Sequence, residues 1–281
     1  MEETVLICED SQESIFTAIY QTYQWKLNRE QVFLQIGEEG NLRLFAKYIK
    51  VETDEGKAGK VASTIIRKMG EGVYWDVCCV LASEDKEKAQ AVYRTIVTAI
   101  DKKQYRNVLS NVKDPFIQKA FELARATSRE INHLEGFLRF QELENGVLYA
   151  RIGPKNNLVT MLIPHFQNRY PLENFMIHDD IRQIFVIHPA GKECIVLMGD
   201  EFSDFHLPEN SEEEKYYQSL FVEFCHTIAI NERKNLKLQR NMLPLRFQEY
   251  MVEFGKNNKN ADSRFKGVKQ NSANFTKIKI R

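Results

Sequence analysis

The stretch "REINHLEGFLRFQEL", residues 129–143, decides the fold, because the hydrophobic pattern changes its period there. Up to Leu134 the apolar residues recur every three or four positions, as on one face of an α-helix, and Gly136 is suited to end that helix. From Phe137 onward apolar and polar residues alternate, as in a half-buried β-strand. We therefore expect a helix-to-strand junction, with helices before it and a sheet after it.

The beginning of the chain predicts an α/β arrangement. The apolar run at residues 5–8 has strand character, and Asp10 with Glu13 forms the capping-box pattern of a helix start. Residues 48–53 alternate as a second strand should, and Asp54 is placed to cap the helix that follows. Strand, helix, strand and helix are thus expected in that order.

A helical region fills the chain between this opening and the junction. From Val73 to about Leu134 the apolar residues keep helical spacing almost throughout. The clearest start signal is Asp114-Pro115, because aspartate accepts hydrogen bonds from free N–H groups and proline at the first helical position loses nothing. Residues 1–135 are therefore expected to form an α/β and then helical region.

The residues after the junction predict an antiparallel sheet built from β-hairpins. Glu144-Asn145-Gly146 contains an Asn-Gly hairpin signal, and Pro189-Ala190-Gly191 marks a second hairpin. A short helix over residues 158–169 is expected to cover the sheet. The expected strands are 137–140, 147–151, 175–178, 183–188 and 193–198.

The last part of the chain predicts amphipathic helices and a basic tail. Ser211 and Glu214 form another capping box ahead of apolar residues at helical spacing. Further helices are expected over 235–242 and from Pro244 to near Phe254. Residues 255–281 are rich in Asn, Ser and Lys and have little to bury, so we expect them to be disordered.

Together these patterns predict an α+β protein. The expected parts are a helix-rich N-terminal region (1–135), a central antiparallel sheet with C-terminal helices (136–254) and a disordered basic tail (255–281). The first two are also compatible with one continuous domain. At 281 residues and 32.9 kDa the chain is long enough to bury about three-quarters of its unfolded surface in a core.

Charge is balanced overall and uneven along the chain. The totals of 39 basic and 39 acidic residues exclude a uniformly basic coat for nucleic acid. Residues 255–281 hold eight Lys or Arg and one Asp, a net charge of +7, which leaves 31 basic and 38 acidic residues for 1–254. Basic character is therefore a local property of the C-terminal end.

Cysteine usage and targeting patterns favour a cytoplasmic protein. The five cysteines are scattered and include no C-x-x-C pair, which argues against a disulfide framework and a zinc ribbon. The N-terminus lacks a basic segment followed by an apolar run, and eighteen consecutive apolar residues occur nowhere, so neither secretion nor membrane contact is expected. No Walker, dinucleotide, G-x-S-x-G or H-E-x-x-H motif occurs, and no cofactor or metal is expected.

Several polar residues are candidates for acid/base or metal chemistry. Glu130 and His133 are three residues apart on the predicted helix, a spacing found in carboxylate-bridged metal sites, although such sites need a second copy that this chain lacks. His165, His178 and Asp179 are the residues that would complete a catalytic group.

The alternative interpretation of Glu130 and His133 is structural. Glu130 would then fix the imidazole tautomer of His133, or both would pair with Arg139 or Arg151 at a domain seam. A buried charge requires such a partner, because leaving it unpaired costs several kcal/mol. This alternative leaves ligand contact open as a further role.

Arg139 and Arg151 lie on neighbouring strands of the predicted hairpin. If both face the same side, their guanidinium groups form a clamp for phosphate or carboxylate. The alternative is ordinary cross-strand pairing with Glu142 or Glu144.

A basic helical face follows the long C-terminal helix. Arg233, Lys237 and Arg240 are spaced i, i+4 and i+7 and therefore lie on one side, where they can neutralise backbone phosphates. The alternative is a solvated charged face. The predicted residues for binding nucleic acid or a partner are Arg139, Arg151, Arg169, Arg233, Asn235, Lys237, Gln239, Arg240 and Arg246.

Four motifs taken together resemble a known family. They are "LICEDSQESIFTAIYQTY", "EINHLEGFLRFQEL" with "GVLYARIGPKNNLVTMLIPHFQNRY", "FMIHDDIRQIFVI", and "FCHTIAINERKNLKLQRNMLPLRFQEYMVEF". The family is a bacterial group of DNA-repair and DNA-metabolism proteins built on a domain of unknown function. The resemblance covers roughly residues 3–254. Matching positions are Glu130, His133, Gly136, Phe137, Arg139, Phe140, Arg151, Pro154, Pro164, His165, Phe166, Arg169, His178, Asp179, Glu232, Arg233, Asn235, Leu238, Gln239 and Pro244.

The resemblance implies a role in DNA repair or modification beside a radical-SAM partner protein. Related members are fused to a uracil-DNA-glycosylase-like module, which this chain lacks, and the C-x-x-x-C-x-x-C motif of a cluster-bearing radical-SAM protein is absent too. The leading hypothesis is therefore an accessory protein that binds DNA, a radical-SAM partner, or both. An enzyme acting on DNA and a protein-interaction scaffold are the two alternatives.

Overall fold

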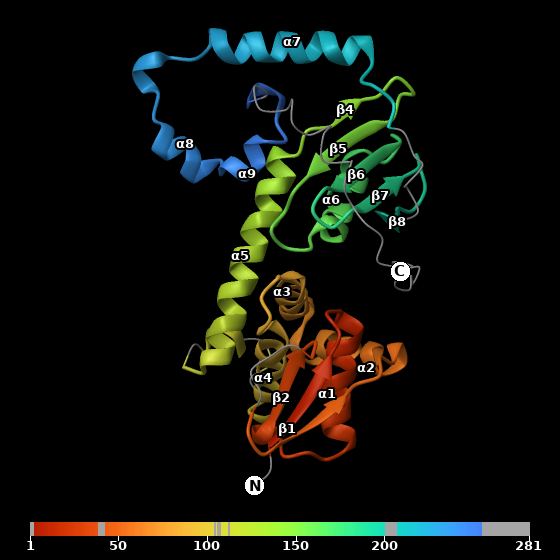
Figure 1. Ribbon diagram of the computed structural model, residues 1–281, viewed down its shortest axis with the longest axis vertical. Coiled ribbons are helices and arrows are strands. Elements are labelled where there is room, and N and C mark those ends of the chain that lie inside the picture. Colours follow the sequence, from red (N-terminus) through yellow and green to blue (C-terminus); the bar gives the residue numbers. More distant parts are fainter. Residues whose placement is uncertain are drawn as a thin grey trace. The chain divides into compact units, whose positions relative to one another are not determined.

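The computed structural model describes residues 3–38, 43–103, 105, 108–111, 113–199 and 207–254 (Figure 1). The predicted α+β class is confirmed, with two sheets and helices between and after them. The tail 255–281, predicted to be disordered, lies outside the described residues. The chain forms two compact units, Met1–Arg129 and Glu130–Arg281, and helix α5 (Pro115–Phe137) contains the boundary between them.

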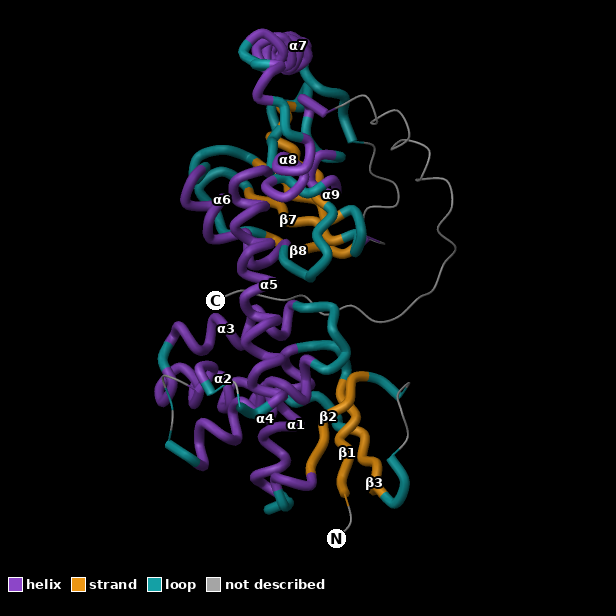
Figure 2. The backbone as a smooth tube through the Cα atoms, turned by 90° about the vertical axis from the view of Figure 1, so that its left-hand side faces the viewer, coloured by secondary structure: helices purple, strands orange, loops and turns teal. Residues whose placement is uncertain are grey.

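The first unit is built on a three-stranded parallel sheet. Its strands have the order β2-β1-β3, so β1 is central and pairs in parallel with both neighbours (Figure 2). Leu6 of β1 lies opposite Leu34 of β2 and Ile49 of β3. The elements are β1 (Glu3–Cys8), α1 (Gln12–Gln24), β2 (Val32–Ile36), β3 (Ala46–Lys50), α2 (Glu55–Met69), α3 (Glu71–Ala82) and α4 (Lys88–Asp101).

The loop after β1 corrects one detail of the predicted helix start. Ser11, rather than Asp10, is the N-cap of α1, and its hydroxyl accepts a hydrogen bond from Ser14 N at 3.1 Å. Asp10 instead forms an ion pair with Lys88, whose amine is almost fully buried and also donates to Ser83 O at 2.6 Å. A buried ammonium requires such partners, so Asp10 stabilises the junction between β1 and α4.

Two cysteines belong to the core of the first unit. Cys8 ends β1 and is 2% exposed, and Cys79 in α3 is fully buried. Burial raises the pKa of each thiol to about 12, because the apolar surroundings disfavour the thiolate. Burial also raises the pKa of the half-buried Cys78 thiol.

Helix α5 starts where the sequence predicts and ends later. The Asp114 carboxylate accepts hydrogen bonds from Phe116 N at 2.9 Å and Ile117 N at 3.4 Å, which confirms the predicted cap. The helix continues through Gly136 to Phe137, and Leu138 N still donates to Leu134 O at 2.9 Å. The predicted strand at residues 137–140 is therefore wrong: Phe137 belongs to the helix, residues 138–140 form neither helix nor strand, and the strand starts at Gln141.

The second unit contains a five-stranded sheet in the order β4-β5-β6-β7-β8. Its neighbouring strands are antiparallel, as predicted, except that β5 and β6 are parallel and are joined through η3 and α6. The predicted turn at Asn145-Gly146 is confirmed, and Gly146 has the positive φ of 74° that the turn requires. The elements are β4 (Gln141–Glu142), β5 (Leu148–Ile152), η3 (Val159–Leu162), α6 (Ile163–Arg169), β6 (Phe175–Asp179), β7 (Ile184–His188) and β8 (Ile195–Met198).

The two faces of this sheet differ in composition. Because side chains alternate along a strand, Phe175, Ile177 and Asp179 lie on one face of β6, and Met176 and His178 lie on the other. Phe175 packs through Phe140 toward α6, with ring-centroid distances of 5.6 Å from Phe140 to Phe175 and 5.4 Å from Phe140 to Phe166. The helix-covered face is therefore the apolar core of the unit.

Three helices follow the sheet, and the first turn of the first helix is hydrogen-bonded to strand β4. Ser211 Oγ accepts from Glu214 N at 3.0 Å, which confirms the predicted cap, and the Glu214 carboxylate accepts from Glu142 N of β4 at 3.2 Å. The elements are α7 (Glu212–Thr227), α8 (Leu236–Met242) and α9 (Leu245–Gln248), with the short 3-10 turn η5 (Asn231–Arg233) before α8. None of the described helices combines the length and apolarity needed to cross a lipid bilayer.

Candidate functional site

Glu130 lies at the centre of the polar junction and is 2% exposed. Its carboxylate accepts hydrogen bonds from Lys155 N at 2.8 Å, Asn156 N at 3.2 Å and Asn156 Nδ2 at 2.7 Å. Arg246, on α9, completes the set with an ion pair at 3.3 Å. One side chain of α5 thereby holds the loop after β5 and the end of the C-terminal helices.

The partners of Glu130 and His133 differ from those expected. Glu130 pairs with Arg246, and none of its hydrogen bonds or ion pairs within the described residues involves His133, Arg139 or Arg151. The His133 ring packs against Phe137 and Phe247, with centroid distances of 5.6 and 5.5 Å. Spacing along α5 could not reveal Arg246, because it lies more than a hundred residues away in the chain.

Asp179 organises the turn between β6 and β7. It is fully buried, and its carboxylate accepts from Ile181 N at 3.0 Å and Arg182 N at 3.1 Å. The Arg182 guanidinium lies 3.3 Å from the same carboxylate and also donates to Pro154 O at 3.0 Å. Burial raises the pKa of Asp179, and the hydrogen bonds from Arg182 oppose that shift. Sequence reasoning missed Arg182, although its position three residues after Asp179 is a signal for such a pair.

The five predicted acid/base candidates do not form one site. His178 and Asp179 are neighbours on β6 and therefore lie on opposite faces of the sheet. His165 is half-buried on α6, where its Nδ1 lies 3.7 Å from a Glu135 carboxylate oxygen. Among the described residues, no group of three or more His, Cys, Asp or Glu side chains is arranged to hold a metal ion.

His178 is the most perturbed of these groups. It is 1% exposed, its Nδ1 is hydrogen-bonded to the Tyr149 hydroxyl at 2.9 Å, and its ring stacks on Phe185 at a centroid distance of 4.1 Å. Nε2 has no hydrogen-bond partner within the described part of the chain. Burial lowers the pKa of His178 to about 4, a shift that nearby Asp180 opposes and Arg151 reinforces. The imidazole is therefore neutral at physiological pH.

Arg151 lies beside His178 on this sheet face, since the two residues are partners in the parallel β5–β6 register. Its guanidinium lies 5.4 Å from the centroid of the Tyr250 ring, and the Tyr250 hydroxyl donates to Asp180 Oδ2 at 3.4 Å. Arg139 is not on a strand: its guanidinium donates to Gly136 O at 2.9 Å at the end of α5. The predicted clamp of Arg139 and Arg151 on two hairpin strands is therefore wrong.

Replacing Gly153 with alanine should destabilise this cluster by about 1–3 kcal/mol, because the new Cβ would overlap the hydroxyl and ring of Tyr250. Urea titration of Gly153→Ala, Tyr250→Ala and the double variant measures the coupling between the two positions. The overlap cannot arise without the tyrosine ring, so the double variant should be no less stable than Tyr250→Ala alone. Equal costs of Gly153→Ala with and without Tyr250 would contradict the assigned contact.

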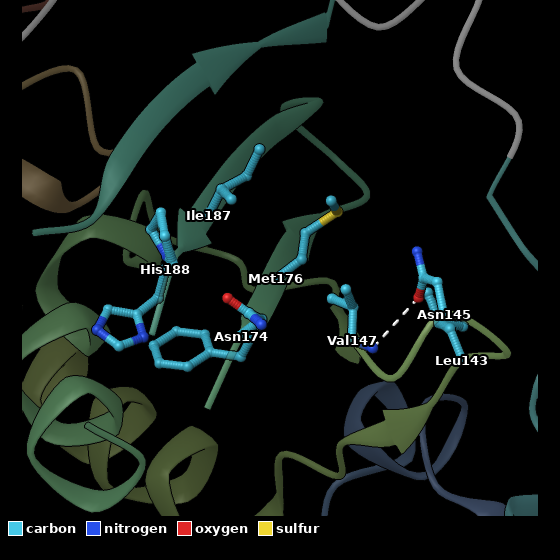
Figure 3. Close-up of a pocket in the computed structure, with 9 residues that line it drawn as sticks. Leu143, Asn145, Val147, Asn174, Met176, Ile187 and His188 are labelled. Carbon is cyan, nitrogen blue, oxygen red and sulfur yellow. Dashed lines mark hydrogen bonds between the residues drawn. The ribbon is translucent and has the colours of Figure 1, made fainter. Parts of the chain in front are cut away.

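A shallow hollow of about 200 Å³ lies where strands β5 and β6 begin and β7 ends, lined mainly by apolar residues such as Met176 and Ile187 (Figure 3). The polar groups at its rim already hold neighbouring turns. Asn145 Oδ1 accepts from Val147 N at 3.2 Å, and Asn174 Oδ1 accepts from Ala190 N at 2.9 Å. His188 is hydrogen-bonded through Nδ1 to Glu173 O at 2.9 Å. The hollow therefore offers apolar surface rather than a catalytic group.

The predicted basic residues lie in the C-terminal part of the chain but not on one helix: Lys237 and Arg240 are on α8, and Arg233 ends η5 before the extended residues Lys234 and Asn235. We call residues 212–245, from the start of α7 to the start of α9, the arm. Arg233, Lys237 and Arg240 on the arm are exposed, and within the described residues none of them forms an ion pair. Asn235 caps α8, and its side chain accepts from Leu238 N at 3.0 Å. These three cations are thus free to contact an anionic surface.

Of the remaining predicted binding residues, some contact other side chains of the protein and others lie outside the group of exposed cations. Arg246 is held by Glu130 and by the Phe247 ring, whose centroid is 4.8 Å from its guanidinium carbon. Arg169, on α6, donates to the Tyr170 hydroxyl at 3.2 Å. Gln239 is exposed on α8. The predicted residues therefore divide between a structural group and the exposed cations of the arm.

The chain matches a known protein family. A family model for a domain of unknown function, DUF4130, matches residues 86–253, more than half of the chain. The chain belongs to the DUF4130 family. The DUF4130 match begins just before α4 and includes α5, the five-stranded sheet and the arm. A search of curated proteins finds no match to this DUF4130 chain.

Proposed function

We propose that the protein is an accessory factor of DNA repair or DNA metabolism that binds nucleic acid through the exposed cations of its arm. The observation that carries the proposal is the contrast among its arginines. Arg182 and Arg246 are paired with buried carboxylates, whereas Arg233, Lys237 and Arg240 are exposed and have no acidic partner within the described residues. Cations that a fold leaves exposed and unpaired in one short stretch of chain are suited to contact phosphates.

The spacing of these cations fits a phosphate backbone better than a small anion. They follow one another along the chain, with Arg233 at the end of η5 and Lys237 and Arg240 on α8. Such a row makes separate contacts with successive phosphates, and each contact releases counterions. The +7 charge of residues 255–281 adds sequence-independent attraction to the same end of the chain.

The chemistry in this proposal is assigned to a partner. The five acid/base candidates each have their own environment, and Glu130 and Asp179 are satisfied by structural hydrogen bonds. The resemblance to DNA-repair proteins supplies a radical-SAM protein as the candidate partner. The proposed role of this chain is to hold DNA for that enzyme.

Fluorescence anisotropy with labelled single-stranded and double-stranded DNA at several salt concentrations tests the proposal. Three phosphate contacts predict a slope of about −2.7 for the logarithm of affinity against the logarithm of salt. The combined variant Arg233→Gln, Lys237→Gln and Arg240→Gln should bind more weakly and should lose about one unit of slope for each contact removed.

A matched control removes the same charge from another helix. Lys60, Arg67 and Lys68 are exposed on α2, so their replacement with glutamine changes the net charge equally. This α2 variant should show the same dependence of DNA affinity on salt as the unmodified protein. Equal losses in both variants would assign the attraction to net charge alone, and no binding at low salt, with or without the partner, would overturn the proposal.

A further inference from the structure

The arm exposes apolar surface to an unusual degree. Of the 21 large apolar side chains that are exposed among the described residues, 11 lie on the arm, and no residue of α7 or α8 is buried. Extended apolar surface on one short segment marks an interaction site, because scattered exposure of single residues is normal and a gathered patch is not.

The apolar residues of α7 form one continuous stripe. Tyr217, Leu220, Phe221, Phe224 and Ile228 recur at helical spacing and are 63%, 45%, 40%, 56% and 58% exposed, respectively. Such a stripe normally faces a core. Here α7 is tied to the sheet through its first turn, by Ser211 and Glu214, while the stripe begins after that turn (Figure 1). The anchoring therefore leaves the stripe uncovered.

Charge is distributed asymmetrically along α7 and the residues that follow it. Glu212, Glu213 and Glu214 form the first turn of α7, whereas Arg233 and Lys234 follow shortly after its C-terminal end. The start of α7 is thus acidic, and the segment beyond its C-terminal end, where Glu232 stands beside Arg233 and Lys234, is basic on balance. When two copies of this segment lie antiparallel, the acidic part of each faces the basic part of the other. A twofold-symmetric contact between identical surfaces requires such self-complementarity.

We propose that α7 pairs antiparallel with α7 of a second copy of the chain, about a twofold axis between Leu220 and Phe221. Tyr217 of each copy then packs beside Phe224 of the other. The acidic first turn of each helix lies near the basic residues that follow the other, and the two helix dipoles run in opposite directions. This pairing goes beyond DNA binding and does not rest on it.

The size of the contact suits a dimer of moderate affinity. A 16-residue helix is about 24 Å long, and covering five large side chains from each copy buries on the order of 1,000 Å². On α8 the basic residues Lys237 and Arg240 lie on a different side of the helix from Leu238 and Met242. Pairing through α7 therefore leaves Lys237 and Arg240 of each copy accessible, while Arg233 lies near the acidic turn of the other copy.

Sedimentation equilibrium of the full-length chain over a range of concentrations tests the pairing. The unmodified protein should form a dimer, and Leu220→Glu with Phe224→Glu should raise the dissociation constant at least about tenfold, because the charges would be buried unpaired. The control Ser219→Glu with His226→Glu adds two acidic groups to the opposite side of α7. It should change the dissociation constant of the dimer less than about threefold. Circular dichroism of all variants verifies that the fold is kept.

Charge reversal tests the antiparallel direction. Glu213→Lys and Lys234→Glu should each weaken the dimer, and combining them in one chain should restore it, because each copy then presents the reversed pair to the other. A monomer at every concentration would overturn the proposal, whether residues 255–281 or a different protein covers the stripe. A dimer that the Leu220 and Phe224 substitutions leave unchanged would overturn it as well.

Discussion

Replacing Glu130 with alanine is expected to lower the free energy of unfolding by about 3–5 kcal/mol. The side chain is almost fully buried and satisfies two backbone N–H groups and the Asn156 amide, in addition to the Arg246 guanidinium. Alanine removes all four interactions at once. The remaining donors in the loop after β5 would be left without their acceptor, and a buried donor without a partner costs about 1–3 kcal/mol.

Urea denaturation followed by circular dichroism measures this loss. Trp25 and Trp75, the two tryptophans of the chain, both lie in the first unit, so their fluorescence follows that unit separately. Glu130→Gln keeps an acceptor and loses the charge, and we expect an intermediate effect. The control is Glu135→Ala on the same helix, which should cost less than about 1 kcal/mol because its contact with His165 is partly exposed. If Glu130→Ala and Glu135→Ala lower the free energy of unfolding equally, the buried contacts of Glu130 do not stabilise the protein as predicted.

Acidification should destabilise the protein through His178 by up to about 3 kcal/mol. In the unfolded chain this histidine titrates near its ordinary pKa of 6.5, whereas burial in the folded state lowers the pKa to about 4. Between these pH values the unfolded state binds the proton and the folded state does not. The contribution is therefore fully present above pH 6.5 and is lost as the pH falls to about 4.

The test compares urea titrations at a series of pH values for the unmodified protein and His178→Phe. The phenyl ring retains the stack on Phe185 and cannot titrate, so the slope of stability against pH should become flatter between pH 4 and 6.5. Asp179 has a raised pKa and acts in the opposite direction, but it is present in both proteins and cancels in the comparison. The control is His226→Gln, which removes a histidine at an exposed position on α7. Parallel curves for all three proteins would rule out a buried neutral imidazole at residue 178.

Local signals in the sequence predicted many of the elements. Asp54 caps α2, Asp114-Pro115 starts α5, and Asn145-Gly146 turns the hairpin, because each signal acts within a few residues. Strand β2 (Val32–Ile36) was missed: it is short and stands between polar segments. Strand pairing was also harder to predict, since β5 finds its parallel partner β6 only after η3 and α6 intervene.

The candidate site was less predictable than the fold, because its contacts join distant segments. The importance of Glu130 was expected, but Arg246 and Asn156 reach it from separate parts of the chain. The predicted single face of Arg233, Lys237 and Arg240 is wrong in part, because the extended residues Lys234 and Asn235 separate Arg233 on η5 from Lys237 and Arg240 on α8. The exposure of all three was expected, since none of them belongs to an apolar stripe. The Tyr250 contact with Asp180 left no signature in the sequence, because it depends on how α9 docks.

The three thiols of the first unit illustrate a chemical consequence of its packing. Cys8, Cys78 and Cys79 all have raised pKa values, so each sulfur stays protonated at neutral pH. The thiolate is the reactive form toward alkylating agents, peroxides and disulfides. Cys8 and Cys79 are also shielded from solvent, so their modification requires the sheet and helices to open first. The rate of alkylation at these two positions therefore reports the opening of the first unit.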